Sequence, residues 1–154
     1  MYKVNIKNKD DYYTIINYLF KICDRFKVVN MYEDIKNIGK VKFTDELMAF
    51  CIGEEKVKKW PGMVKAPKSI IRTYLCNKKT LKLFKEYKKF FEYRVEDNTG
   101  YYDTFGCNGQ IDISFYNNDA CVLYTVGHEG LCISGDIELE IILNKNNIDF
   151  EKWF

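Results

Sequence analysis

The sequence predicts an α+β fold, in which two amphipathic helices pack on a mainly antiparallel sheet that ends in a C-terminal β-meander. Helical spacing of apolar residues over 9–25 and 78–92 indicates the two helices. Alternating apolar and polar residues in the last third of the chain indicate the sheet. Because 154 residues suit one hydrophobic core and no low-complexity linker interrupts them, we expect residues 1–154 to form a single α+β domain.

The chain begins with a short alternating stretch, residues 2–6, and continues into the first helix. Apolar residues recur within 9–25 at the i, i+3, i+4 spacing of a helix that faces a core. Asn8 or Asp10 can cap this helix, because either side chain can accept hydrogen bonds from the free amides of the first turn.

The segment after the first helix carries a mixed signal. Residues 27–32 are β-like and precede a predicted turn at Gly39. Residues 44–52 fit either a short helix capped by Thr44 or a buried strand, because a run of this length is common to both. Periodicity therefore leaves the two alternatives open.

Both prolines of the chain lie within residues 60–67, which predicts a shaped loop because proline removes a backbone donor and fixes φ. Trp60 in this loop either plugs an edge of the core or anchors a partner, and its large apolar area favours the core. Residues 69–76 are β-branched and aromatic and predict a strand before the second helix, 78–92. We interpret the lysines of this helix as its solvated face, with weak nucleic-acid binding as the alternative: Lys78, Lys79, Lys82, Lys85, Lys88 and Lys89.

The rest of the chain divides into a polar segment and a meander. Residues 94–109 are polar and contain three glycines, so we expect a long exposed loop of the kind that often carries function. Residues 111–116 and 121–126 alternate with period two around a polar turn and predict a hairpin. After a further turn, the alternation of residues 137–143 predicts another strand.

Composition and charge argue against several classes of protein. A formal charge of +2 is too small to imply steering toward nucleic acid or membrane, and no apolar run reaches the ~20 residues of a membrane span. The N-terminus lacks a secretory h-region, so we expect a cytoplasmic protein whose six cysteines are mostly reduced thiols. With one histidine and no CxxC pair, we predict no metal site and no cofactor.

The stretch Tyr124–Ile133, YTVGHEGLCI, contains that single histidine. His128 is the only side chain suited to general-base catalysis near neutral pH without a perturbed pKa. An enzyme would use it with Glu129, Asp103 and Asp112 as a hydrolytic or metal-dependent site. However, the sequence contains no G-x-S-x-G, HExxH or phosphate-binding glycine motif. We therefore favour a structural role, in which His128 ends a strand at a glycine-hinged corner.

Strand register bears on the same choice. If Tyr116 pairs with Cys121, the alternation of the two strands places Asp112 and His128 on opposite faces of the sheet. Neighbours along a strand also point to opposite faces, so Glu129 is predicted to turn away from His128. Both expectations weaken the proposal of a catalytic site.

Three separated motifs, Trp60-Pro-Gly62, Asp112-Ile-Ser-Phe-Tyr116 and His128-Glu-Gly130, occur in an order that resembles a family of small bacterial immunity proteins of polymorphic toxin systems. The resemblance covers residues 60–130, and its motifs are short. It implies a non-enzymatic protein that binds and neutralises a cognate toxin. The matched residues would then be scaffold: Trp60, Gly62, Asp112, His128 and Glu129.

The resemblance does not identify the residues that contact the partner, so exposure has to place them. Residues 94–108 of the polar segment are our first choice, because an acidic and aromatic loop can oppose a basic cleft on a toxin. The predicted contact residues are Glu96, Asp97, Tyr101, Tyr102 and Asp103.

Overall fold

A computed structural model describes residues 1–31 and 41–153, so the predicted turn at Gly39 lies outside the described residues. One large sheet has the strand order β10-β1-β9-β8-β7-β2-β4-β3, and each of its pairings is antiparallel. Its strands are β1 (Tyr2–Asn5), β2 (Arg25–Asn30), β3 (Cys51–Val57), β4 (Ser69–Leu75), β7 (Ile111–Asn117), β8 (Ala120–Val126), β9 (Leu131–Ser134) and β10 (Asp149–Lys152).

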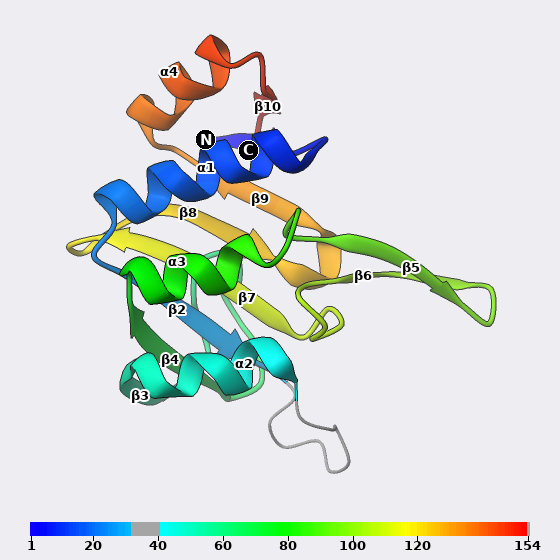
Figure 1. The fold of residues 1–154 in the computed structure, drawn as a ribbon. Helices are drawn as coiled ribbons and strands as arrows, with labels where there is room; N and C mark the ends of the chain where they lie inside the picture. Colours follow the sequence, from blue (N-terminus) through cyan, green and yellow to red (C-terminus); the bar gives the residue numbers. More distant parts are fainter. Residues whose placement is uncertain (32–40, 154) are drawn as a thin grey trace.

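The helices and a second, small sheet complete the α+β fold (Figure 1). The helices are α1 (Lys9–Ile22), α2 (Lys42–Leu47), α3 (Lys78–Lys85) and α4 (Ile137–Lys145), and short 3-10 turns are η1 (Met48–Phe50) and η2 (Gly127–Glu129). The small sheet consists of β5 (Glu92–Glu96) and β6 (Thr99–Asp103), and it extends away from the body of the molecule (Figure 1). No helix among the described residues has the length and apolar character needed to cross a membrane.

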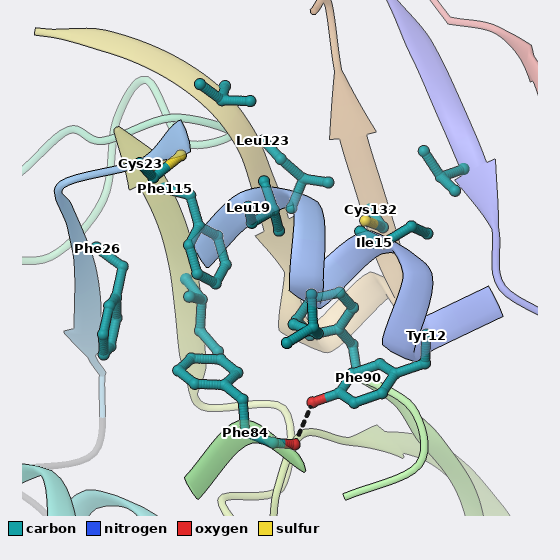
Figure 2. Packing of buried hydrophobic residues seen from close by; sticks show 14 of the residues in the cluster. Tyr12, Ile15, Leu19, Cys23, Phe26, Phe84, Phe90, Phe115, Leu123 and Cys132 are labelled. Carbon is teal, nitrogen blue, oxygen red and sulfur yellow. Dashed lines mark hydrogen bonds between the residues drawn. The ribbon is translucent and has the colours of Figure 1, made fainter. Parts of the chain in front are cut away.

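The main core lies between the large sheet and the helices that cover one of its faces (Figure 1). Aromatic rings dominate it, and the Phe84 ring of α3 packs edge-on against Phe26 of β2 at 5.1 Å between centroids. The buried Tyr12 hydroxyl of α1 donates to the backbone oxygen of Phe84 at 2.7 Å, which ties the two helices together (Figure 2). The core therefore fixes α1 and α3 on the sheet.

Both predicted helices form, but each ends early. Asn8 caps α1 by accepting from the amide of Asp11 at 2.9 Å, as one of the two predicted caps. Helix α1 ends at Ile22, and α3 ends at Lys85 rather than continuing to residue 92. After α3 the chain turns so that Phe90 is buried against Tyr12, at 5.2 Å between ring centroids. The chain after α3 therefore buries the Phe90 ring and does not form the last predicted turn of the helix.

The predicted strand 137–143 is wrong, because these residues form α4. Asp136 caps the helix by accepting from the amide of Leu139 at 2.9 Å. The short run I-E-L-E-I-I-L fits the alternation of a strand and the spacing of a helix equally well. The N-cap hydrogen bond favours the helix. Leu139 and Leu143, one helical turn apart, are buried, whereas Ile137 and Ile141 remain exposed.

The predicted long loop 94–109 is also wrong over most of its length. Residues 92–103 form the β5–β6 hairpin, whose turn residues Asp97 and Asn98 have φ of 48° and 63°. Two consecutive positive φ values are the requirement of the tight hairpin turn that matches strand twist, and Asp and Asn tolerate them. The polar composition therefore correctly predicted that this segment is exposed, but it wrongly suggested that the segment lacks regular secondary structure.

Residues 44–52 combine both alternatives that the sequence left open, because helix α2 passes through η1 into strand β3. Helix α2 starts at Lys42, and Thr44 donates from its hydroxyl to the oxygen of Val41 instead of capping the helix. Strand β3 lies at the edge of the large sheet, next to β4.

The β7–β8 hairpin forms with a register that changes part-way along. Tyr116 pairs with Cys121 as predicted, but a bulge then places Ser114 opposite Tyr124. By alternation, Asp112 therefore shares a face with Tyr124 and Val126. This face lies opposite the main core. The expectation that Asp112 and His128 lie on opposite faces assumed an unbroken register, and this assumption is wrong.

Candidate functional site

Three residues from distant parts of the chain meet at a buried point, which we call the junction: Trp60, Asp112 and Gly127. The Trp60 indole Nε1 donates to Oδ2 of Asp112 at 2.8 Å, and the Gly127 amide donates to Oδ1 at 2.8 Å. Trp60 is 6% exposed and Asp112 2% exposed. Trp60 also packs with Val29 and Ile71 in a small second cluster, as the core interpretation of this tryptophan predicted.

Close approach of the backbone at the junction requires glycine at two positions. A Cβ on Gly127 would lie 2.3 Å from the backbone oxygen of Ile111, closer than real atoms come. Gly62 has φ of 88°, and a Cβ there would lie 2.8 Å from Val126 Cγ2 and 3.0 Å from the Tyr124 ring. The W-P-G loop therefore packs on β8, and the backbone just before the H-E-G motif packs on β7.

Burial raises the pKa of the Asp112 carboxyl above its usual value. The hydrogen bonds from Trp60 and Gly127 act in the opposite direction, as does the proximity of His128. Both carboxylate oxygens accept bonds from buried donors within the protein, so the arrangement suits a structural tie.

The corner at His128 forms as predicted, with the 3-10 turn η2 followed by Gly130 in the left-handed conformation at φ of 63°. The expectation that Glu129 turns away from His128 is wrong, because strand alternation stops at this turn. His128 Nε2 lies 3.4 Å from Glu129 Oε1, and the two side chains are 47% and 55% exposed. This is a solvent-facing contact between sequence neighbours.

The structure does not assemble the four residues of the enzyme alternative. Asp103 is buried and accepts from the guanidinium Nε of Arg94 and the amides of Gly106 and Asn108, at 3.2, 3.3 and 2.6 Å. Asp112 is held in the junction. The pocket that includes His128 is lined by neither aspartate. Within residues 1–31 and 41–153, no three His, Cys, Asp or Glu side chains are grouped as a metal site would need.

The β5–β6 hairpin has two different faces, because its cross-strand pairs alternate. One face carries Tyr93, Val95 and Tyr102, and the Tyr93 and Tyr102 rings pack edge-on at 5.1 Å. Tyr93 is 62% exposed, Val95 64% and Tyr102 36%. The Tyr93 ring also covers Gly100, where a Cβ would overlap its hydroxyl. The apolar face is therefore solvent-facing, and its tyrosine rings pack on each other and on the hairpin backbone.

The predicted contact residues fall into two groups on this hairpin. Glu96 and Asp97 are exposed at its tip, Tyr101 is half-buried, and Tyr102 belongs to the apolar face. The Asp103 carboxylate is enclosed by its three donors and is not available at the surface. The predicted contact residues did not include Tyr93 or Val95, although the alternation of E-Y-R-V-E before D-N is a hairpin signal.

The base of the hairpin packs on the corner at η2. The Tyr102 ring lies so close to Gly130 that a Cβ there would approach it to 2.7 Å. Gly109 is equally close to the corner, because a Cβ on it would lie 2.8 Å from the Cα of His128. His128, Tyr101, Tyr102 and Glu96 thereby line one pocket of about 340 Å³.

Charged side chains also line a hollow of about 600 Å³ beside the end of α3, among them Lys42, Glu86, Lys88 and Lys89. Most lysines of α3 and the turn after it are exposed, as the solvated-face interpretation predicted. None of the six cysteines, all within the described residues, forms a disulfide, and Cys23, Cys107 and Cys132 are buried.

Comparisons of the chain with protein-family models, with curated proteins and with solved structures gave no match.

Proposed function

We propose that this chain is a non-enzymatic protein-binding module that binds and neutralises a cognate toxin, in the manner that its resemblance to immunity proteins implies. The contact surface in this proposal is the β5–β6 hairpin. The observation that carries it is the hairpin's exposed apolar face, Tyr93, Val95 and Tyr102, on an element outside the large sheet.

Physical considerations support this choice of surface. An isolated two-stranded hairpin is marginally stable in water, so an exposed one gains order when a partner covers it. Tyrosine is enriched in protein interfaces because it combines apolar area with a polar tip. Apolar side chains gathered on one face mark interaction sites more often than single exposed ones do.

Charge suggests the character of the partner. The hairpin contains four acidic residues and one basic residue, and the basic one, Arg94, is paired within the hairpin. Acidic rims favour association with a basic surface and speed the encounter. The partner in this proposal therefore offers an apolar patch surrounded by positive charge.

The experiment uses the protein encoded by the neighbouring reading frame. We expect the purified chain to bind it, and co-expression of the chain to restore growth to cells that produce it. A double variant, Tyr93→Ser with Val95→Ser, should lose binding by at least about tenfold, since each buried apolar side chain contributes about 1.5 kcal/mol or more.

The matched control replaces two exposed aliphatic residues elsewhere, Ile137→Ser with Ile141→Ser on α4, which are 74% and 61% exposed. This control should bind and protect as the wild type does. Unchanged binding by the hairpin variant, with loss in the α4 variant, would move the contact surface to α4.

A further inference from the structure

The pocket between the hairpin and the corner at η2 has a definite chemical character. Its polar and aromatic lining comes from both elements: Glu96, Tyr101, Tyr102, Asn108, Gln110 and His128. We propose that this pocket receives an arginine side chain of the protein partner. The inference rests on the proposed function and names the side chain that the hairpin would recognise.

The charge of the pocket favours a cation. Its lining includes the Glu96 carboxylate and neither lysine nor arginine. Glu96 accepts one hydrogen bond, from the Tyr101 hydroxyl at 3.0 Å, and in the described part of the chain no basic side chain pairs with it. Arg94, the one basic residue of the hairpin, is bound to Glu92 and Asp103, both at 3.2 Å. An incoming guanidinium therefore meets an unpaired carboxylate.

The remaining groups suit a planar guanidinium better than the compact ammonium of lysine. A guanidinium donates through a fork of N–H groups to a carboxylate and also stacks on aromatic surface. Tyr101, whose hydroxyl donates to Glu96, supplies aromatic surface beside that carboxylate. The amide side chains of Asn108 and Gln110 offer oxygen acceptors for the N–H groups that Glu96 leaves unused.

The pocket is held in shape by contacts beneath it. The backbone amide of Asn108 donates a hydrogen bond to the Asp103 carboxylate at 2.6 Å, and the backbone at Gly109 packs directly against His128. Tyr102 is seated on Gly130. Because these contacts lie within the protein itself, an arginine side chain would enter a largely formed site and lose little affinity to reorganisation.

The test titrates the whole chain with a short peptide, acetyl-Gly-Arg-Gly-amide, and follows backbone amide and histidine ring signals by NMR. The single histidine gives one unambiguous ring signal in the pocket. The control peptide carries citrulline, which has the shape of arginine without its charge. We expect saturable shifts at Tyr101, Tyr102 and His128 with the arginine peptide and much smaller shifts with citrulline.

Two variants decide where binding occurs. Glu96→Gln keeps the size of the side chain and should weaken the arginine peptide by on the order of tenfold, as loss of a charge-assisted bond predicts. Glu55→Gln, an exposed glutamate of β3, is the matched control and should leave affinity unchanged. Equal shifts from both peptides, equal affinity of Glu96→Gln, or shifts outside the pocket would overturn the inference.

The two proposals fail in different ways. If the neighbouring gene product binds through Tyr93 and Val95 while the arginine peptide gives no pocket shifts, the inference fails and the proposed function stands. If the peptide fills the pocket while the gene product does not bind, the toxin-binding function fails and the arginine site stands.

Discussion

The junction and the β5–β6 hairpin both contain aromatic side chains, but the junction buries its tryptophan, whereas the hairpin exposes Tyr93. In the junction, the Trp60 indole and the Asp112 carboxylate are buried, and the indole donates a hydrogen bond to the carboxylate. In the hairpin, Tyr93 and Val95 face solvent on an element that extends from the body (Figure 1). Buried polar groups whose hydrogen bonds are satisfied indicate a structural role, whereas exposed apolar side chains indicate a contact surface.

The comparison also reassigns the lone histidine. His128 lies between the two regions, because η2 follows Val126 beside the junction and packs against β6 of the hairpin. Its backbone forms the corner, and the residue, whose side chain is 47% exposed, is among those that line the pocket. His128 therefore connects the buried junction to the pocket beside the hairpin.

The largest effect should come from removing the junction carboxylate. We expect Asp112→Ala to lower the free energy of unfolding by about 3 kcal/mol, because two buried donors lose their acceptor. Urea denaturation measures this directly. Glu55→Ala, an exposed control, should stay within about 0.5 kcal/mol of wild type. A loss below about 1 kcal/mol in Asp112→Ala would mean that the junction does not hold the fold.

A smaller effect is expected where the hairpin meets the corner. Gly130→Ala should destabilise the protein by about 1–2 kcal/mol, because φ of 63° is strained for alanine and the new methyl group meets the Tyr102 ring. Gly135→Ala is the matched control, since its Cβ would meet only Met1 Cγ, at 3.6 Å. Equal thermal stability of the two variants would contradict the close packing at Gly130.

The pH dependence of the junction should be smaller still and has a definite sign. The raised pKa of Asp112 means that the folded state retains a proton after the unfolded state has lost it. The stability from this group is therefore complete below the ordinary aspartate pKa of about 3.9 and is lost as pH rises through the raised value. The stability of wild type minus that of Asp112→Asn should fall as pH rises across this window. A difference that increases with pH would show that the two hydrogen bonds outweigh burial.

The hairpin variant should separate stability from binding. Tyr93→Ser with Val95→Ser is expected to change the free energy of unfolding by no more than about 1 kcal/mol, because both side chains are mostly solvated and only one aromatic pair is lost. Chemical denaturation beside the binding assay checks it. Global unfolding of this variant would assign the hairpin to the scaffold instead.

The smallest effect belongs to His128→Ala. Its ring is 47% exposed and contacts an exposed neighbour, so we expect less than about 0.5 kcal/mol of destabilisation. Thermal unfolding of the variant tests this. A loss of several kcal/mol would require a buried role that the observed exposure does not support.

The sequence predicted those elements whose local signals agree with one another. Helix α1 combines apolar spacing with a cap at Asn8, and β7 alternates cleanly before a polar turn. The apolar residues of 137–143 fit both the period of a strand and that of a helix. Only the hydrogen bond from the Leu139 amide to Asp136 favours the helix. A run this short carries too few residues for its period to decide.

The site was less predictable than the fold, for identifiable reasons. The bulge after Phe115 shifts the register of β8 by one residue, and this shift places Tyr124 and Val126 on the face that carries Asp112 and Trp60. Nothing in the local sequence marks the bulge, because it is set by packing across the sheet. Asp103 looked like an exposed acid in a polar segment, but a bend of the chain at Gly106 surrounds it with donors.

Hydrogen–deuterium exchange of the chain with and without the neighbouring gene product tests the central claim most directly. We predict that added protection on binding is concentrated in residues 92–103 and at the pocket around His128. Protection in the junction and in α4 should be unchanged by the partner. Protection that appears on α4 or β3 and leaves the hairpin exchanging freely would contradict the assignment of the hairpin as the contact surface.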